Sequence, residues 1–135
     1  MRVYVDSSAV IKRVIAEAES EQLIGAIDGH VTGGDLLVSS SLAWIEVARA
    51  LRARHGVRLD LVADDVEAAL SGVAEHPLVA EAVGLARRIN PDVLRSLDAI
   101  HLASALLLDA DMMLTYDVQL AEACRENGLA AMGPR

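Results

Sequence analysis

Four acidic side chains are placed along the chain so that they could act together on one substrate. Asp6 and Asp117 each come at or just after the end of a short apolar segment. Glu46 and Asp98 each lie in a stretch whose apolar residues have helical spacing. Carboxylate oxygens are the ligands that Mg²⁺ and Mn²⁺ prefer. The four residues therefore predict a site for a divalent cation.

The segment around Asp98 is the most informative part of this pattern. Residues 94–108 are rich in leucine, alanine and isoleucine and predict a helix that is apolar around most of its circumference, in the middle of the domain. An ionised carboxylate in such a helix is costly unless a positive charge compensates it. Either Arg95, three residues before Asp98, or a bound cation would supply that charge.

A divalent cation in an acidic pocket suits the hydrolysis of phosphodiester bonds. The metal lowers the pKa of a bound water, orients it and neutralises charge on the phosphate, so no nucleophilic side chain is needed. Thr115 and Ser7 stand beside two of the acids and could add a hydroxyl ligand or hold a water. Cys124 is the only cysteine, which excludes an internal disulfide and a thiolate cluster for zinc.

Each of these residues also has an ordinary structural interpretation. Asp6 could belong to a turn at a strand end, and Glu46 could pair with Arg49 on an exposed helix face. Asp117 could cap the helix that follows it. His101, three residues after Asp98, could serve in helix packing or as a metal ligand. It is the joint order of these residues that favours the metal site.

The elements that would position the acids alternate between strands and helices. Strands are predicted at residues 2–6, 36–39, 112–115 and 129–132. Helices are predicted at residues 9–14, 16–28, 42–55, 60–73, 79–89, 94–108 and 118–127, while 76–79 fits either a strand or a loop. This alternation predicts an α/β fold, with a small, mostly parallel sheet between two layers of helices. Such sheets bind ligands beyond the carboxyl ends of their strands, where Asp6 and Asp117 are expected.

Composition narrows the class of protein further. The 135 residues suit one domain, and a hydrophobic content of 53% excludes a disordered chain. No apolar run reaches the roughly 18 residues of a membrane span, and no signal peptide pattern opens the chain, so we expect a cytoplasmic protein. The net charge of −8 argues against a general nucleic-acid coating protein, but it permits nucleic-acid chemistry at one cation-filled site.

The order of these motifs resembles that of the PIN domain, and in particular of VapC-type toxins from bacterial toxin–antitoxin pairs. The resemblance covers essentially the whole chain, although residues 59–89 share only its layout. Its motifs here are Asp6-Ser7-Ser8-Ala9, Glu46 with Arg49, the run from Ser96 to Ala105, and Leu114-Thr115-Tyr116-Asp117. The central run and the last motif are the most specific.

The resemblance implies one PIN domain over residues 1–135, with a three-layer α/β/α sandwich. It implies an Mg²⁺- or Mn²⁺-dependent endoribonuclease that acts as a toxin on a structured RNA such as tRNA or rRNA. Asp6, Glu46, Asp98 and Asp117 match the family's acidic quartet, which holds the metal, and Thr115 matches a supporting hydroxyl. The resemblance also implies a homodimer and a cognate VapB-type antitoxin that silences the toxin.

Other functions fit the sequence less well. A catalytically silent PIN-like module that binds RNA or protein is the main alternative, and the complete acidic quartet counts against it. A phosphatase of the haloacid dehalogenase type needs an aspartate where Ser8 stands. A receiver domain needs an acid where Val5 stands and a late lysine, but Lys12 is the only lysine. A dinucleotide site is excluded because glycines 33–34 precede a strand instead of following one.

Overall fold

A single parallel sheet forms the centre of the molecule, in a computed structural model that describes residues 1–55 and 59–135. The strands, in the order in which they neighbour one another, are β3 (Val73–His76), β2 (Leu36–Ser40), β1 (Arg2–Val5), β4 (Met112–Leu114) and β5 (Ala130–Met132). Each neighbouring pair is parallel. Along the chain, β2 and β3 are added on one side of β1, and β4 and β5 are then added on the other side. The strand order therefore reverses between β1 and β4, which is where sheets of this type bind ligands.

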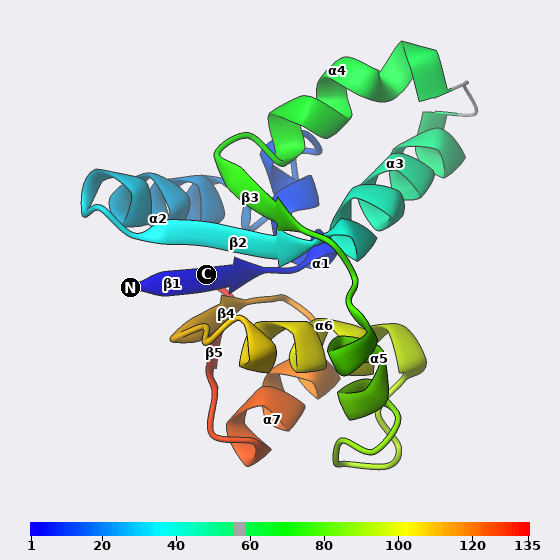
Figure 1. The fold of residues 1–135 in the computed structure, drawn as a ribbon. Helices are drawn as coiled ribbons and strands as arrows, with labels where there is room; N and C mark the ends of the chain where they lie inside the picture. The colour runs from blue at the N-terminus through cyan, green and yellow to red at the C-terminus, as the bar shows by residue number, and fades with distance from the viewer. Residues whose placement is uncertain (56–58) are drawn as a thin grey trace.

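Helices cover both faces of the sheet (Figure 1). One layer contains α1 (Ser7–Val10), a 3₁₀ turn at Ile11–Arg13, α2 (Ser20–Thr32), α3 (Ser41–His55) and α4 (Leu59–Ala69). The opposite layer contains α5 (Ala80–Ala86), α6 (Ser96–Leu107) and α7 (Val118–Glu126). The predicted three-layer α/β/α sandwich with a small parallel sheet is thereby confirmed.

The central strand supplies both halves of the core. Val3 and Val5 are fully buried against the layer of α1 to α4. Tyr4, which points to the other face as the two-residue period of a strand requires, packs with Leu102 of α6 and Leu120 of α7. The short β1 is thus covered on both sides, and its carboxyl end is fixed in position by two cores.

The helix predicted for the middle of the domain, α6, is buried all round in its central turn, where residues 101–105 are all buried. Leu102 is fully buried, whereas Leu97 and Leu107 are 50% and 45% exposed. The prediction is therefore confirmed for the central turn of α6, and the exposed leucines lie near its two ends. None of the described helices, α6 included, is long and apolar enough to cross a membrane.

Two element boundaries differ from the predictions for local reasons. The sequence leaves residues 76–79 open between a strand and a loop. The strand lies mostly earlier, at Val73–His76, because Gly72 turns the chain with a φ of 77° soon after α4 ends. Helix α2 begins at Ser20 and not at residue 16. The Ser20 hydroxyl donates to the Ile15 carbonyl and accepts from the Glu17 amide, which holds the preceding residues in a turn.

The last residues of the chain pass closely over the segment that follows β4. The Thr115 amide donates to the Met132 carbonyl at 3.0 Å, and the Tyr116 hydroxyl donates to the Pro134 carbonyl at 2.7 Å. A Cβ on Gly133 would lie 2.7 Å from the Thr115 carbonyl oxygen. Only glycine therefore allows the tail, residues 133–135, to approach this closely.

We expect Gly133→Ala to lower the free energy of unfolding by about 1–3 kcal/mol, because the added methyl group meets backbone that cannot move aside freely. Urea unfolding measures the change. The matched control is Gly25→Ala within α2, where an added Cβ meets nothing within 4 Å. That control should leave stability unchanged or raise it by up to about 1 kcal/mol. Equal effects of the two substitutions would contradict the close approach of the tail.

Candidate active site

Asp6 is held at the carboxyl end of β1 by residues from two parts of the chain. It is only 4% exposed. Its Oδ2 accepts a hydrogen bond of 2.6 Å from the Thr115 hydroxyl, which lies 109 residues away in sequence. Its Oδ1 accepts from the Ser8 hydroxyl at 2.7 Å and from the Ala9 amide at 3.0 Å, so that Asp6 caps α1. The supporting serine is thus Ser8, and not Ser7 as the resemblance implied.

The buried carboxylate of Asp6 is costly to ionise. Burial raises the pKa of Asp6 above its ordinary range, while hydrogen bonds from Thr115 and Ser8 and the charge of His101 act in the opposite direction. Burial dominates. Additional positive charge near Asp6 would therefore be favourable.

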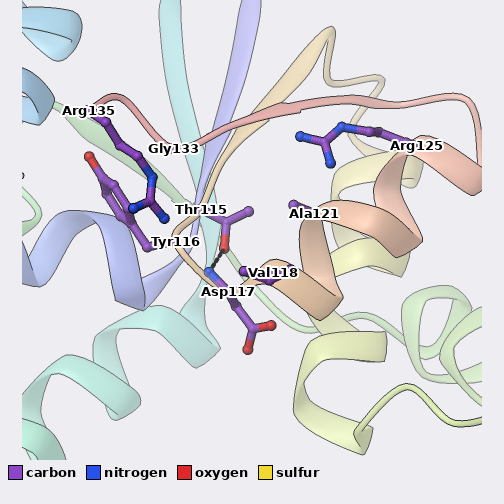
Figure 2. A pocket seen from close by; sticks show the side chains of 8 residues that line it. All are labelled: Thr115, Tyr116, Asp117, Val118, Ala121, Arg125, Gly133 and Arg135. Atoms are coloured by element: carbon purple, nitrogen blue, oxygen red, sulfur yellow. Dashed lines mark hydrogen bonds between the residues drawn. The ribbon is translucent and has the colours of Figure 1, made fainter.

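Asp117 stands at the end of the neighbouring strand, and Thr115 connects it to Asp6. The Thr115 hydroxyl accepts a hydrogen bond of 3.1 Å from the Asp117 amide while it donates to Asp6 (Figure 2). Asp117 Oδ1 accepts from the Leu120 amide at 3.0 Å and caps α7, as the sequence suggested. One hydroxyl therefore positions both strand-end acids.

Glu46 is fixed by a buried histidine that sequence reasoning did not assign to the site. His101 Nε2 lies 2.5 Å from Glu46 Oε1, and its Nδ1 lies 2.7 Å from the Tyr4 hydroxyl. Burial lowers the pKa of His101, but Glu46 and Tyr4 outweigh burial and raise it to about 10. The imidazole is therefore positively charged at neutral pH. His101 is neither a packing residue alone nor a free metal ligand, because both ring nitrogens already have partners.

Asp98 lies in the first turn of α6 among the other three acids. Burial, and then the charge of Asp117, raise the pKa of Asp98 to about 6, with smaller contributions from Asp6 and Glu46 in the same direction. Asp98 is therefore within electrostatic range of the other three acids. Within residues 1–55 and 59–135, no ion pair joins Asp98 to Arg95 or Glu46 to Arg49. The structure therefore contradicts the alternative interpretations in which these two acids pair with arginines on their own helices.

Free acceptor sites remain on all four acids, and on Glu46 they include Oε2, since His101 engages only Oε1. A carboxylate oxygen has two lone pairs. In the described part of the chain, Asp98 accepts no hydrogen bond, Asp117 accepts only at Oδ1, and Asp6 Oδ2 accepts one. The carboxylate oxygens that remain free are hard ligands, and together they carry an excess of negative charge. This set of ligands fits a divalent cation such as Mg²⁺. In their present positions, however, no three acidic, histidine or cysteine side chains of the described residues converge closely enough to hold a metal.

Comparison with known proteins identifies the family. A profile of the PIN domain matches residues 3–126. The chain belongs to the PIN domain family. It is 34% identical over 134 residues to ribonuclease VapC47 of Mycobacterium tuberculosis (strain CDC 1551 / Oshkosh), a match that covers 98% of this chain and 96% of that protein. It is also 34% identical over 137 residues to ribonuclease VapC46 of M. tuberculosis (strain ATCC 25618 / H37Rv), with 98% and 97% covered.

Solved structures share the fold of this PIN domain. It matches the structure of VapBC2 from Rickettsia felis bound to a promoter DNA fragment with a TM-score of 0.78 and 9% identity, over 100% of both chains. It matches VapC20 of M. tuberculosis, described as a sarcin-ricin loop cleaving toxin, with a TM-score of 0.73 and 15% identity over 98% and 99% of the two chains. At such identities these matches support the fold alone.

The raised pKa of Asp98 gives a prediction about stability. The folded protein holds this proton more tightly than the unfolded chain, whose aspartates titrate near about 3.9. Stability should therefore fall as the pH rises from about 4 to about 6 and should stay lower above that range. In metal-free buffer at about pH 7.5, we expect Asp98→Asn to be more stable than the parent by about 1 kcal/mol, because water screens part of the repulsion.

Urea unfolding at about pH 7.5 and about pH 4 tests this prediction, and the gain should shrink at the lower pH. Asp64→Asn, at an exposed position on α4, is the control and should show no gain at either pH. A stabilisation by Asp98→Asn that does not depend on pH would contradict a cost of ionising Asp98 through burial and the neighbouring acids.

The contact between Tyr4 and His101 gives a second prediction. Tyr4→Phe removes a buried hydroxyl that bonds to His101 and accepts from the Ser40 amide at 3.3 Å. We expect a loss of about 1–3 kcal/mol in urea unfolding, since two buried groups lose a partner. An NMR titration should also show a lower pKa for His101. Tyr116→Phe, whose hydroxyl meets the Pro134 carbonyl, is the control and should leave that pKa unchanged.

Proposed function

We propose that this PIN domain is an Mg²⁺- or Mn²⁺-dependent endoribonuclease of the VapC type, the toxin of a toxin–antitoxin pair. The observation that carries the proposal is the pair of strand-end acids, Asp6 and Asp117, which the Thr115 hydroxyl joins where the strand order reverses. Asp98, which accepts no hydrogen bond in the described structure, is near enough for their charges to raise its pKa. The relatives named ribonuclease VapC, at 34% identity over nearly the whole chain, support the same activity.

The carboxylate oxygens that accept few or no hydrogen bonds are the ones that would bind the cation. Asp98, Asp117 Oδ2 and Asp6 Oδ2 would hold the cation, and Glu46 would contribute from the side through the oxygen that His101 does not engage. When bound, the metal would supply an acidified water and neutralise charge on the scissile phosphate.

The other residues of the site act by holding the acids in place. Thr115 fixes Asp6 and Asp117 relative to each other through one hydroxyl. The positive charge of His101, itself held by Tyr4, orients Glu46 and offsets part of the repulsion in the pocket. These contacts orient Asp6, Asp117 and Glu46 before substrate arrives, which favours an electrostatic mechanism. The acids would still have to move closer together to hold a cation.

The family also suggests the partners. The substrate would be a structured RNA such as tRNA or rRNA, and a cognate VapB-type antitoxin would silence the toxin in the cytoplasm. A homodimer is supported by apolar side chains that α5 and α6 leave exposed, among them Val83 and Leu107, because such a surface is normally covered.

RNA cleavage by the purified protein, free of any antitoxin, tests the proposal. Cleavage of total cellular RNA should require Mg²⁺ or Mn²⁺, stop in EDTA, and fall by on the order of 100-fold or more in Asp98→Asn, because one direct ligand is lost. Mg²⁺ should raise the melting temperature of the parent more than that of Asp98→Asn. Asp64→Asn is the matched control and should cleave like the parent.

Two outcomes would contradict the proposal in different ways. Cleavage or growth arrest undiminished in Asp98→Asn would remove the catalytic role of the acids. Absence of cleavage by metal-loaded protein on any RNA would favour the alternative, a catalytically silent module that binds RNA or protein.

A further inference from the structure

A second pocket adjoins the acidic site on the far side of the loop between β4 and α7. Its cavity is about 210 Å³, and it is lined by residues of that loop, of α7 and of the tail (Figure 2). Thr115 and Asp117 form the wall that it shares with the acidic site, and Gly133 lies opposite. Because Gly133 lacks a side chain, the tail can come close enough to complete the pocket.

Two arginines give this pocket a positive charge. Arg125 extends from α7 and Arg135 from the tail, on opposite sides of the cavity (Figure 2). Arg125 donates one hydrogen bond, of 3.0 Å, to the Ala131 carbonyl, and Arg135 lies 4.0 Å from Glu19 Oε1. A guanidinium group has five N–H donors, so both retain donors for a ligand.

The one acid of the pocket lining does not neutralise these arginines. The carboxylate of Asp117 points away from both of them (Figure 2), and its Oδ1 caps α7. Arg135 forms an ion pair with Glu19, but that carboxylate lies outside the lining and is shared with Lys12 at 3.1 Å. In a chain with a net charge of −8, the space between Arg125 and Arg135 therefore keeps a local positive charge beside the acids.

We propose that this arginine pocket binds a backbone phosphate of the RNA strand next to the bond that is cleaved. This inference rests on the proposed ribonuclease function and adds a positioning role. The planar fork of arginine matches the oxygens of a phosphate. In this arrangement one phosphate of the RNA lies at the acids, and the RNA then passes Asp117, which borders the arginine pocket. The next phosphate of the RNA contacts the guanidinium groups of Arg125 and Arg135. The acids repel these flanking phosphates, and the arginine pocket supplies the attraction that holds the strand in register.

Binding of an intact RNA tests the arginine pocket separately from catalysis. The probe is a fluorescein-labelled single-stranded RNA 12-mer of mixed sequence, with Asp98→Asn as the common background so that the RNA is not cleaved. Fluorescence anisotropy gives Kd across a range of KCl concentrations. Arg125→Ala and Arg135→Ala are compared with Arg2→Ala, an exposed arginine that also donates to a backbone carbonyl but lies at the amino end of β1.

Each pocket substitution should weaken binding by roughly 3- to 10-fold and reduce the slope of log Kd against log salt by about 0.7, the value for one phosphate contact on a single strand. Arg2→Ala should change neither quantity. Arg125→Lys and Arg135→Lys should retain most of the slope. Melting temperatures check folding, and Arg135→Ala is the more decisive variant because it removes no hydrogen bond found in the described structure.

The possible failures are distinguishable. Cleavage by the parent protein together with an unchanged Kd and salt slope in both alanine variants would overturn the arginine pocket and leave the proposed function intact. If the alanine variants lose binding to the VapB-type antitoxin but keep their affinity for RNA, the arginine pocket as a phosphate site is likewise overturned, in favour of a protein ligand. A parent that binds the 12-mer through these arginines but cleaves no RNA would contradict the ribonuclease function alone.

Discussion

The parallel pairing of β1 with β4 is the constraint on which the rest of the site depends. The register sets Val5 beside Leu114, so the next residues, Asp6 and Thr115, meet at the strand ends. The Thr115 hydroxyl then joins Asp6 to the backbone of Asp117. A shift of this register by one residue would turn Thr115 to the opposite face of the sheet and separate the two acids.

The site combines a surplus of negative charge with one fixed positive charge. His101 is buried between Glu46 and Tyr4, which contact its Nε2 and its Nδ1 and together favour the protonated ring. The pKa of Asp98, by contrast, is raised first by burial and then by the charge of Asp117, with smaller contributions from the other acids. The histidine organises one side of the pocket permanently, whereas the other side is left electrostatically unsatisfied. Such an imbalance is costly for folding and is typical of positions that serve binding or catalysis.

The parts predictable from sequence were those marked by local patterns. Strand-end acids, helical spacing and turn residues indicated the fold class and brought forward Asp6, Asp98 and Asp117. The role of His101 was not predictable, because it depends on Tyr4 and Glu46, which lie 97 and 55 residues away in sequence.

The tail has a practical consequence for work with this protein. Arg135 lines the arginine pocket, and Gly133 leaves no clearance between the tail and Thr115. A purification tag or fluorescent fusion joined after Arg135 would emerge beside the acidic site and compete with long ligands for the same approach. A tag joined before Met1 would begin at the amino end of β1, away from the strand ends that carry the acids. The position of the fusion is therefore an experimental variable in any assay of this molecule.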